Sequence, residues 1–284
     1  MKAEVTIPLP DGVEGFPPRL LLDDGPITQR SMLATLMEGK RYEPVTMDLL
    51  VKLLRPGDWV MDIGAHVGLV TVLAASRVGP KGGVVAVEPD EANLAALRVN
   101  LALNGFEERV RLVAGVAADA EGEREIHLNR DNDGGHALWE PGLHPFNERT
   151  AQAPLAKRVT AVTLDGLNDR FGPLPVKLVK IDTEGAEQLV LSGGQKVLGR
   201  RCPPYVLAEL NPFGLEAMGA SQLSLRTMME ALGYATFLPR GSALPAFIPP
   251  GTLIDWTDYV GNVLFAKPGE LCRIWPVVEA AAGV

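Results

Sequence analysis

The feature that most constrains the fold is an alternation of short apolar runs with longer amphipathic ones. From Trp59 onward, strand-like runs rich in valine and isoleucine recur, and the first two are each followed by apolar residues at helical spacing. Such alternation predicts a parallel sheet with crossover helices. We expect seven core strands and one or two more in an insertion. The strand-like runs are 59–63, 84–87, 110–113, 159–164, 176–181, 205–210, 234–238 and 260–266. The helical runs beyond residue 63 are 67–78, 93–103, 186–198 and 223–232.

Two segments depart from this alternation and suggest the organisation of the chain. Residues 1–30 contain five prolines and predict an irregular arm, followed by a cap helix from Ser31. Between about residues 122 and 158, a segment rich in Asn, Asp, Gly and Pro is too long for a simple connection. We therefore expect an arm and cap at 1–45, one main domain at 46–270 with this insertion after its third strand, and a tail at 271–284.

The charge balance excludes some classes of partner. The net charge is −8, so no domain-wide positive field exists to neutralise a phosphate backbone, and a nucleic-acid partner is not expected. No apolar run is long enough to span a membrane, and the first residues lack the apolar core of a signal peptide. These observations predict a cytoplasmic protein without a membrane partner.

The sharpest local motif is a glycine turn, DIGAHVG at 62–68, which follows the first strand of the alternation and opens a helix. A dinucleotide fingerprint would place glycines where this chain has His66 and Leu69, so pyrophosphate binding is poorly supported. Asp62 at the end of the strand suits a ligand with a cationic amine and no phosphate. S-adenosylmethionine (SAM) is such a ligand. The turn assigns cofactor contacts to Asp62, Gly64, Ala65, His66 and Gly68.

Two further strand ends support this cofactor. Glu88 and Pro89 follow the second strand, 26 residues after Asp62, and an acid there can accept both ribose hydroxyls. After the third strand, the backbone N–H of Val116 is expected against the adenine. A turn-capping carboxylate for Asp62 and a solvated strand end for Glu88 are the alternatives.

The motif at the fourth strand, VKIDTEGAE at 179–187, resembles the hallmark of the FkbM family of SAM-dependent methyltransferases. Other pieces agree in order over roughly residues 42–239: Tyr42-Glu43, Pro56-Gly57-Asp58, the glycine turn, Glu88-Pro89, Asn100, Asn104, Thr163-Leu164-Asp165 and Glu209. The resemblance implies an α/β class I methyltransferase (Rossmann-like) fold, a seven-stranded mostly parallel sheet whose last strand is antiparallel. It also implies O-methylation, usually of a sugar or secondary-metabolite hydroxyl.

Candidate catalytic residues come from the same strand ends. Asp182 ends a central strand beside that of Asp62 and is expected nearest the transferred methyl. Glu209 and then His136, in the insertion, are the next candidates for a general base. Glu184 and Glu187 are interpreted mainly as acids that support the start of the following helix. Glu43 is expected to close over the methionine end of the cofactor.

A metal-assisted reaction is an alternative that the spacing permits. Asp182, Glu209 and Asn211 offer hard oxygen ligands suitable for Mg²⁺, although no metal is expected. The insertion at about 129–149 is expected to form the acceptor pocket and its lid with the N-terminal arm, and Trp139 and Phe146 to offer flat apolar surface.

The leading hypothesis is an O-methyltransferase acting on a small hydroxylated acceptor. The rivals are a methyltransferase on RNA or protein, and a catalytically silent SAM-binding protein of the same fold.

Overall fold

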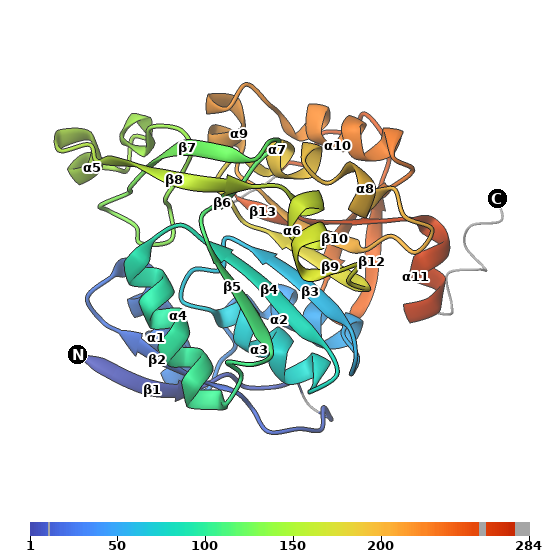
Figure 1. Cartoon of the computed structure of the whole chain (residues 1–284), viewed down its shortest axis with the longest axis horizontal. Coiled ribbons are helices and arrows are strands. Elements are labelled where there is room, and N and C mark those ends of the chain that lie inside the picture. The colour runs from blue at the N-terminus through green and yellow to red at the C-terminus, as the bar shows by residue number, and fades with distance from the viewer. Residues whose placement is uncertain (11, 256–259, 276–284) are drawn as a thin grey trace.

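The computed structural model describes residues 1–10, 12–255 and 260–275 and contains one central sheet flanked by helices (Figure 1). The expected seven strands form the sheet together with an eighth at one edge. In spatial order they are β12 (Ala243–Ile248), β11 (Ala235–Arg240), β13 (Gly261–Ala266), β10 (Tyr205–Leu210), β9 (Val176–Ile181), β3 (Trp59–Ile63), β4 (Gly83–Glu88) and β5 (Val110–Ala114).

The pairing of these strands confirms the expected class I methyltransferase fold. The five strands from β10 to β5 are mutually parallel, whereas β13 runs antiparallel to both β10 and β11. The additional strand β12 is a hairpin partner of β11 in a stretch where the sequence indicated only a Pro/Gly-rich crossing. It contains Pro245, which an edge strand tolerates because its outer N–H groups need no partner.

Helices cover both faces of the sheet and bury a separate apolar core on each. One core lies under α1 (Ile27–Met37), α2 (Pro44–Leu53), α3 (Leu69–Val78) and α4 (Glu91–Asn104), with α11 (Pro268–Ile274) at its margin. The other lies under α6 (Leu164–Phe171), α7 (Glu187–Ser192), α8 (Gln195–Leu198), α9 (Pro212–Ala217) and α10 (Gln222–Ala231). The sequence predicted one helix over 186–198, but Gly193 and Gly194 divide it into α7 and α8.

The N-terminal residues are more regular than the sequence indicated. The expectation of an irregular arm is wrong, because β1 (Lys2–Thr6) and β2 (Arg19–Asp23) form an antiparallel pair before the cap helix α1. Side-chain amides of α4 hold this pair: Asn100 accepts a hydrogen bond from the Leu21 N–H at 2.7 Å, and Asn104 bonds both the N–H and the carbonyl of Arg19. The hairpin is thereby fixed to the helix that follows β4.

The insertion after the third strand forms a small sheet of its own, seen as a separate layer beside the main sheet in Figure 1. It consists of β6 (Val116–Ala117), β8 (Ala156–Val162) and β7 (Gly122–His127), with a short 3-10 turn (Pro141–Leu143) and α5 (Glu148–Gln152) between β7 and β8. Ile126 of β7 is buried in a small apolar cluster with Val116, Ala118 and Ala161. The expected tail at 271–284 begins inside α11, and residues 276–284 lie outside the described part of the chain.

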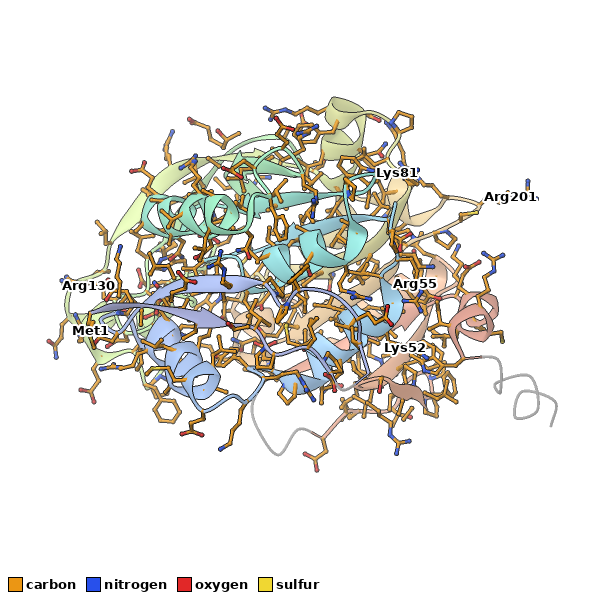
Figure 2. All side chains as sticks on the ribbon, turned by 90° about the horizontal axis from the view of Figure 1, so that it is seen from below. Met1, Lys52, Arg55, Lys81, Arg130 and Arg201 are labelled. Atoms are coloured by element: carbon orange, nitrogen blue, oxygen red, sulfur yellow. The ribbon has the colours of Figure 1, made fainter. Side chains whose placement is uncertain are left out.

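The two ends of the main sheet differ in what surrounds them. In Figure 2, Arg55, Lys81 and Arg201, which precede β3, β4 and β10, lie at one end of the molecule, whereas Met1 and Arg130 lie at the other. The insertion therefore lies at the carboxyl end of the parallel strands, and the N-terminal hairpin runs along α4 with its Met1 end on that side. No helix within the described ranges is both long and apolar enough to cross a membrane.

Candidate active site

A cavity of about 250 Å³ lies at the carboxyl ends of the parallel strands, where doubly wound folds bind their ligands. Its floor is formed by residues that follow β3, β4, β5 and β9. Residues of α1 and the insertion cover it, and we refer to these as the roof: Thr28, Met32, Asn132, Asp133 and Gly134. Of the predicted cofactor residues, those that line the cavity are Glu43, Asp62, Gly64, Ala65, His66, Glu88, Pro89, Val116 and Asp182.

The glycine turn packs directly against the end of β9. Gly64 has a φ of +84°, and a Cβ there would lie 1.8 Å from the carbonyl oxygen of Asp182, so only glycine fits. His66 adopts a φ of +51° without being glycine. Gly68, predicted to contact the cofactor, is absent from the cavity lining: it is the N-cap of α3, and a Cβ there would meet Leu97 at 2.3 Å.

Glu88 is held with both carboxylate oxygens fixed. One oxygen accepts the His66 N–H and the other accepts the Asp90 N–H, each at 2.9 Å, and the Asn93 amide donates at 3.3 Å. The side chain is 4% exposed, and burial raises its pKa although these donors oppose the rise. Carboxylate oxygens have lone pairs beyond those the protein uses, so Glu88 can still accept from a ligand.

Asp62 lies beneath the turn and is fully enclosed. It is 1% exposed, and the Thr71 hydroxyl donates a short hydrogen bond to it. Burial is the largest influence on its pKa and raises it to about 7, in spite of that hydrogen bond. Asp62 also lines the cavity, so a cation that binds there would favour its ionised form.

Asp133 joins the roof to the floor. Its carboxylate accepts the Thr28 N–H at 2.7 Å and lies 2.9 Å from His66 Nε2, while Gln29 Nε2 donates to it at 3.3 Å. Its backbone carbonyl accepts from Asn93 Nδ2 at 3.1 Å. Four segments thus meet at one residue: α1, the glycine turn, the start of α4 and the insertion.

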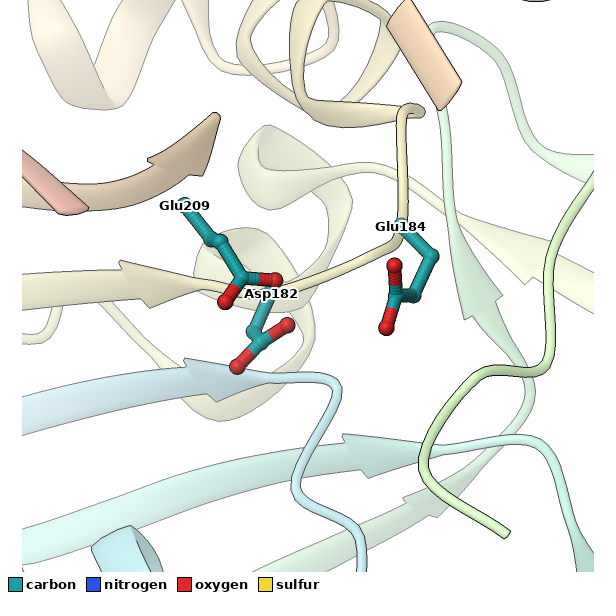
Figure 3. Close-up of side chains that lie close together, drawn as sticks. All are labelled: Asp182, Glu184 and Glu209. Carbon is teal, nitrogen blue, oxygen red and sulfur yellow. The ribbon is translucent and has the colours of Figure 1, made fainter. Parts of the chain in front are cut away.

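Three carboxyl groups gather at the other end of the cavity, and Figure 3 shows Asp182 and Glu209 close together with Glu184 facing them. Each offers an oxygen within 4.8 Å of the others, and all three are half-buried. Lys180, 2% exposed, places Nζ 3.1 Å from Asp182 Oδ2. Burial and the charge of Asp182 raise the pKa of Glu184 to about 7.

Comparison with known proteins identifies the family. The Methyltransferase FkbM domain matches residues 62–236, which is more than half of the chain. The chain belongs to the FkbM family of methyltransferases. This is the family that the motif at 179–187 resembles.

Several solved methyltransferase structures are similar to this chain at low sequence identity. Methyltransferase FkbM from Methylobacillus flagellatus KT is 14% identical with a TM-score of 0.44, covering 84% of this chain and 53% of that one, so this chain spans about half its length. A putative rRNA-methylase from Clostridium thermocellum is 14% identical with a TM-score of 0.43, covering 78% and 90%. Aeropyrum pernix fibrillarin, with natively bound SAM, is 13% identical with a TM-score of 0.36, covering 83% and 74%. Comparison with curated proteins found no match.

The other proposed catalytic residues of this FkbM methyltransferase occupy different places. Glu209 lines the cavity beside Asp182, as expected for neighbouring strand ends. His136 also lines it, but its Nδ1 accepts the Asn129 N–H at 3.0 Å and its Nε2 lies 3.9 Å from Asp90. These contacts place His136 near the Glu88 end of the cavity.

Trp139 and Asn211, for which the sequence suggested roles in binding, have structural roles instead. Trp139 was expected to present its ring to the acceptor, yet it is buried outside the cavity lining and donates through Nε1 to the Glu184 carbonyl at 2.6 Å. Asn211, a possible magnesium ligand, caps α9 through Oδ1 and donates to Glu184 at 2.7 Å. Glu187 accepts the N–H groups of Thr183 and Gly185, which supports the turn as expected.

Sequence reasoning missed two charged residues of the site. Lys180 stands in an apolar strand, and a lysine there gives no signal of its own that it turns inward. Asp133 lies in the irregular insertion, and its partner His66 is 67 residues away, so no local spacing links them. In both cases the role depends on contacts that only the fold creates.

Proposed function

We propose that this cavity binds SAM and that the enzyme transfers the methyl group to a hydroxyl of a small acceptor. The observation that carries this proposal is one cavity with Glu88 at one end and the Asp182 group at the other, on either side of the glycine turn. Glu88 is suited to a ribose, and the Asp182 group is suited to a reacting centre. The glycine turn lies between them and lacks the glycines of a pyrophosphate site.

The residues present fit the cofactor. Glu88 is positioned to accept from the ribose hydroxyls, and Val116 and Pro89 lie on the same side for the adenine. Among the ionisable side chains of the remaining lining, carboxyl groups outnumber cationic ones and suit a ligand that carries a sulfonium and an ammonium. When bound, SAM supplies an electrophilic methyl group on sulfur. The chain's own work is then to align the acceptor, exclude water and accept a proton.

Asp182 is the group that we expect to accept the proton. Burial raises its pKa, but the charge of Lys180 and hydrogen bonds from Glu209 and Lys180 lower it by more, so the net shift is downward. An aliphatic hydroxyl does not ionise beforehand, and a nearby carboxylate need only take its proton as the new bond forms. The roof would keep water from the same space.

The charge of the lining favours uncharged or cationic acceptors. In the described part of the chain, Lys180 is the only Lys or Arg side chain that lines the cavity, and Asp182 already pairs with it. A phosphorylated or carboxylated acceptor would meet the unpaired carboxyl groups instead. Together with the net charge of −8 this disfavours RNA, and we propose a small neutral hydroxylated compound such as a sugar unit or a natural-product scaffold.

The test is methyl transfer from labelled SAM to panels of sugars and hydroxylated natural products. With an acceptor in hand, Asp182→Asn should lower turnover by about 10² to 10⁴-fold and SAM affinity by much less. Glu216→Gln, an exposed acid of α9, is the matched control and should behave as wild type. If turnover survives Asp182→Asn but is lost with a chelator and restored by Mg²⁺, metal-assisted transfer replaces this mechanism.

A further inference from the structure

A second pocket, of about 320 Å³, lies between the start of α1 and the insertion. Only Asp133 and His136 line both this pocket and the active-site cavity. Three arginines from different segments line the second pocket: Arg30 of α1, Arg130 of the loop after β7, and Arg149 of α5. The two pockets are therefore neighbours, but one is lined mainly by acids and the other by guanidinium groups.

The three arginines lack the partners that comparable arginines have. Arg124, on β7 of the same insertion, pairs with Asp119 at 3.1 Å. In the described part of the chain, by contrast, no hydrogen bond or ion pair involves the guanidinium group of Arg30, Arg130 or Arg149, and the latter two donate only through their backbone. All three residues are exposed, so a ligand from solvent can reach them.

The two acids that line this pocket are engaged as helix caps. Asp131 accepts the N–H groups of Arg149 and Thr150, at the start of α5, at 3.2 and 2.8 Å. Asp133 accepts the N–H of Thr28, at the start of α1. Three guanidinium charges thus face two carboxylates that already have partners. The pocket keeps an excess of positive charge in a chain whose net charge is −8.

A buried amide adds a directed donor to the same pocket. Asn129 is 7% exposed, and its Oδ1 accepts the N–H groups of Asp131 and Asn132 and the hydroxyl of Thr150. Because two backbone N–H groups require an oxygen there, the other atom of the amide is the nitrogen. Among the described residues this Nδ2 has no hydrogen-bond partner, although buried polar groups usually have one. Asn129 therefore offers an unused N–H to the pocket that it lines.

The start of α1 contributes to the same field. Gly25, Pro26 and Ile27 line the pocket, Pro26 supplies no side-chain cap, and the first turn of this 11-residue helix contains no acid. Unpaired N–H groups and the helix dipole favour an anion at such a position. Its effect adds to that of the arginines and of Asn129.

We propose that this pocket binds a phosphate group, held by Arg30, Arg130, Arg149 and the amide of Asn129. Guanidinium groups bind phosphate oxygens through paired, charge-assisted hydrogen bonds, which an exposed and unpaired arginine is free to form. A phosphate there would join α1 to the insertion, the two segments that supply the roof. The group lies outside the cavity, so this inference goes beyond the proposed function and does not depend on it.

The first experiment is thermal unfolding of the full chain without SAM, in up to about 50 mM inorganic phosphate, with sodium chloride holding the ionic strength constant. Phosphate should raise the melting temperature of wild type by about 2 to 4 °C. Arg30→Gln and Arg149→Gln should each weaken phosphate binding by about three- to tenfold. The matched control is Arg98→Gln, an exposed arginine of α4 outside the pocket, and it should bind phosphate as wild type does.

A further variant tests the buried donor. Asn129→Asp keeps the oxygen that accepts three hydrogen bonds and replaces the free amide by a carboxylate oxygen. Phosphate should no longer shift its melting temperature, because a carboxylate repels the anion. The proposal is overturned if sodium chloride stabilises wild type as much as phosphate does. It is also overturned if Arg98→Gln loses as much phosphate affinity as Arg30→Gln and Arg149→Gln.

A comparison of inorganic phosphate with ribose 5-phosphate by calorimetry identifies the source of the group. An affinity at least about tenfold higher for the ester assigns the pocket to an organic phosphate, whereas an equal or lower one assigns it to the free ion. Either result supports the site, and binding of neither compound refutes it. Labelled methyl transfer to hydroxyl compounds tests the proposed function separately, since phosphate binding requires no methyl acceptor.

Discussion

Replacing Asp133 by Asn tests whether the roof is fastened to the floor of the cavity. The side chain is 16% exposed. Burial raises the pKa of Asp133, but hydrogen bonds from His66, Thr28 and Gln29, with the charge of His66, lower it to about 2 from an ordinary 3.8. This difference corresponds to at most about 2.5 kcal/mol in favour of the ionised form, of which partial solvent access leaves about 1 to 2 kcal/mol.

The assay is thermal unfolding of the free enzyme from about pH 8 downward. Because the folded pKa is depressed, the stabilisation is fully present above about pH 4 and is lost as the pH falls through 2. Asp133→Asn should therefore melt roughly 2 to 6 °C below wild type between about pH 5 and 8, and the gap should narrow below about pH 4. Asp119→Asn removes an exposed ion pair to Arg124 and should cost much less. If Asp133→Asn melts with wild type, the four-way junction contributes no stability.

Two further predictions concern the cofactor. Glu88→Gln should weaken SAM binding by about 10 to 100-fold in calorimetry, because hydrogen bonds to a charged acceptor contribute about 1.5 to 3 kcal/mol. The control Glu91→Gln, on the exposed start of α4, should bind SAM as wild type does. If Glu88→Gln and wild type bind SAM with equal affinity, Glu88 does not hold the ribose. In the folded enzyme the pKa values of Asp62 and Glu184 are about 7, which is above the values that these groups have in the unfolded chain. The two groups therefore stabilise the free enzyme at low pH, and this stabilisation is lost as the pH rises through 7. Their ionisation should raise the affinity for SAM more than for neutral-sulfur S-adenosylhomocysteine across that range, and parallel titrations of the two ligands would contradict the charge argument.

Local patterns predicted the sheet, because each buried parallel strand is an apolar run with its own turn signal. The bounds of the strand Trp59–Ile63 and the antiparallel direction of the last strand agree with the expectation. The hairpin of β1 and β2 was not predicted, because four prolines between these short strands obscure the period of two that Ala3 and Val5, and Leu20 and Leu22, display. Strand β12 was not predicted because it contains a proline, which normally argues against a strand. At the edge of a sheet the missing N–H of proline leaves no partner without a hydrogen bond.

The sequence predicted which carboxylates form the site, because it marks the carboxyl ends of the parallel strands that carry them. It did not predict which of these carboxyl groups are ionised. Lys180 belongs to the pattern of an apolar strand, and its pairing with Asp182 depends on the inward turn of one side chain. The junction at Asp133 reaches a donor in α1 that is 105 residues distant, and contacts of that separation have no sequence signature.

The boundary of the family domain has a consequence for how such enzymes diversify. The match begins at residue 62, yet Thr28, Met32, Tyr42 and Glu43 line the cavity from the preceding segment. One side of the cavity is thus closed by residues that precede the matched region. Exchanging residues 1–45 between relatives would therefore replace this wall of the cavity and leave the ends of β3, β4 and β9 in place, provided that the incoming hairpin presents backbone groups to Asn100 and Asn104.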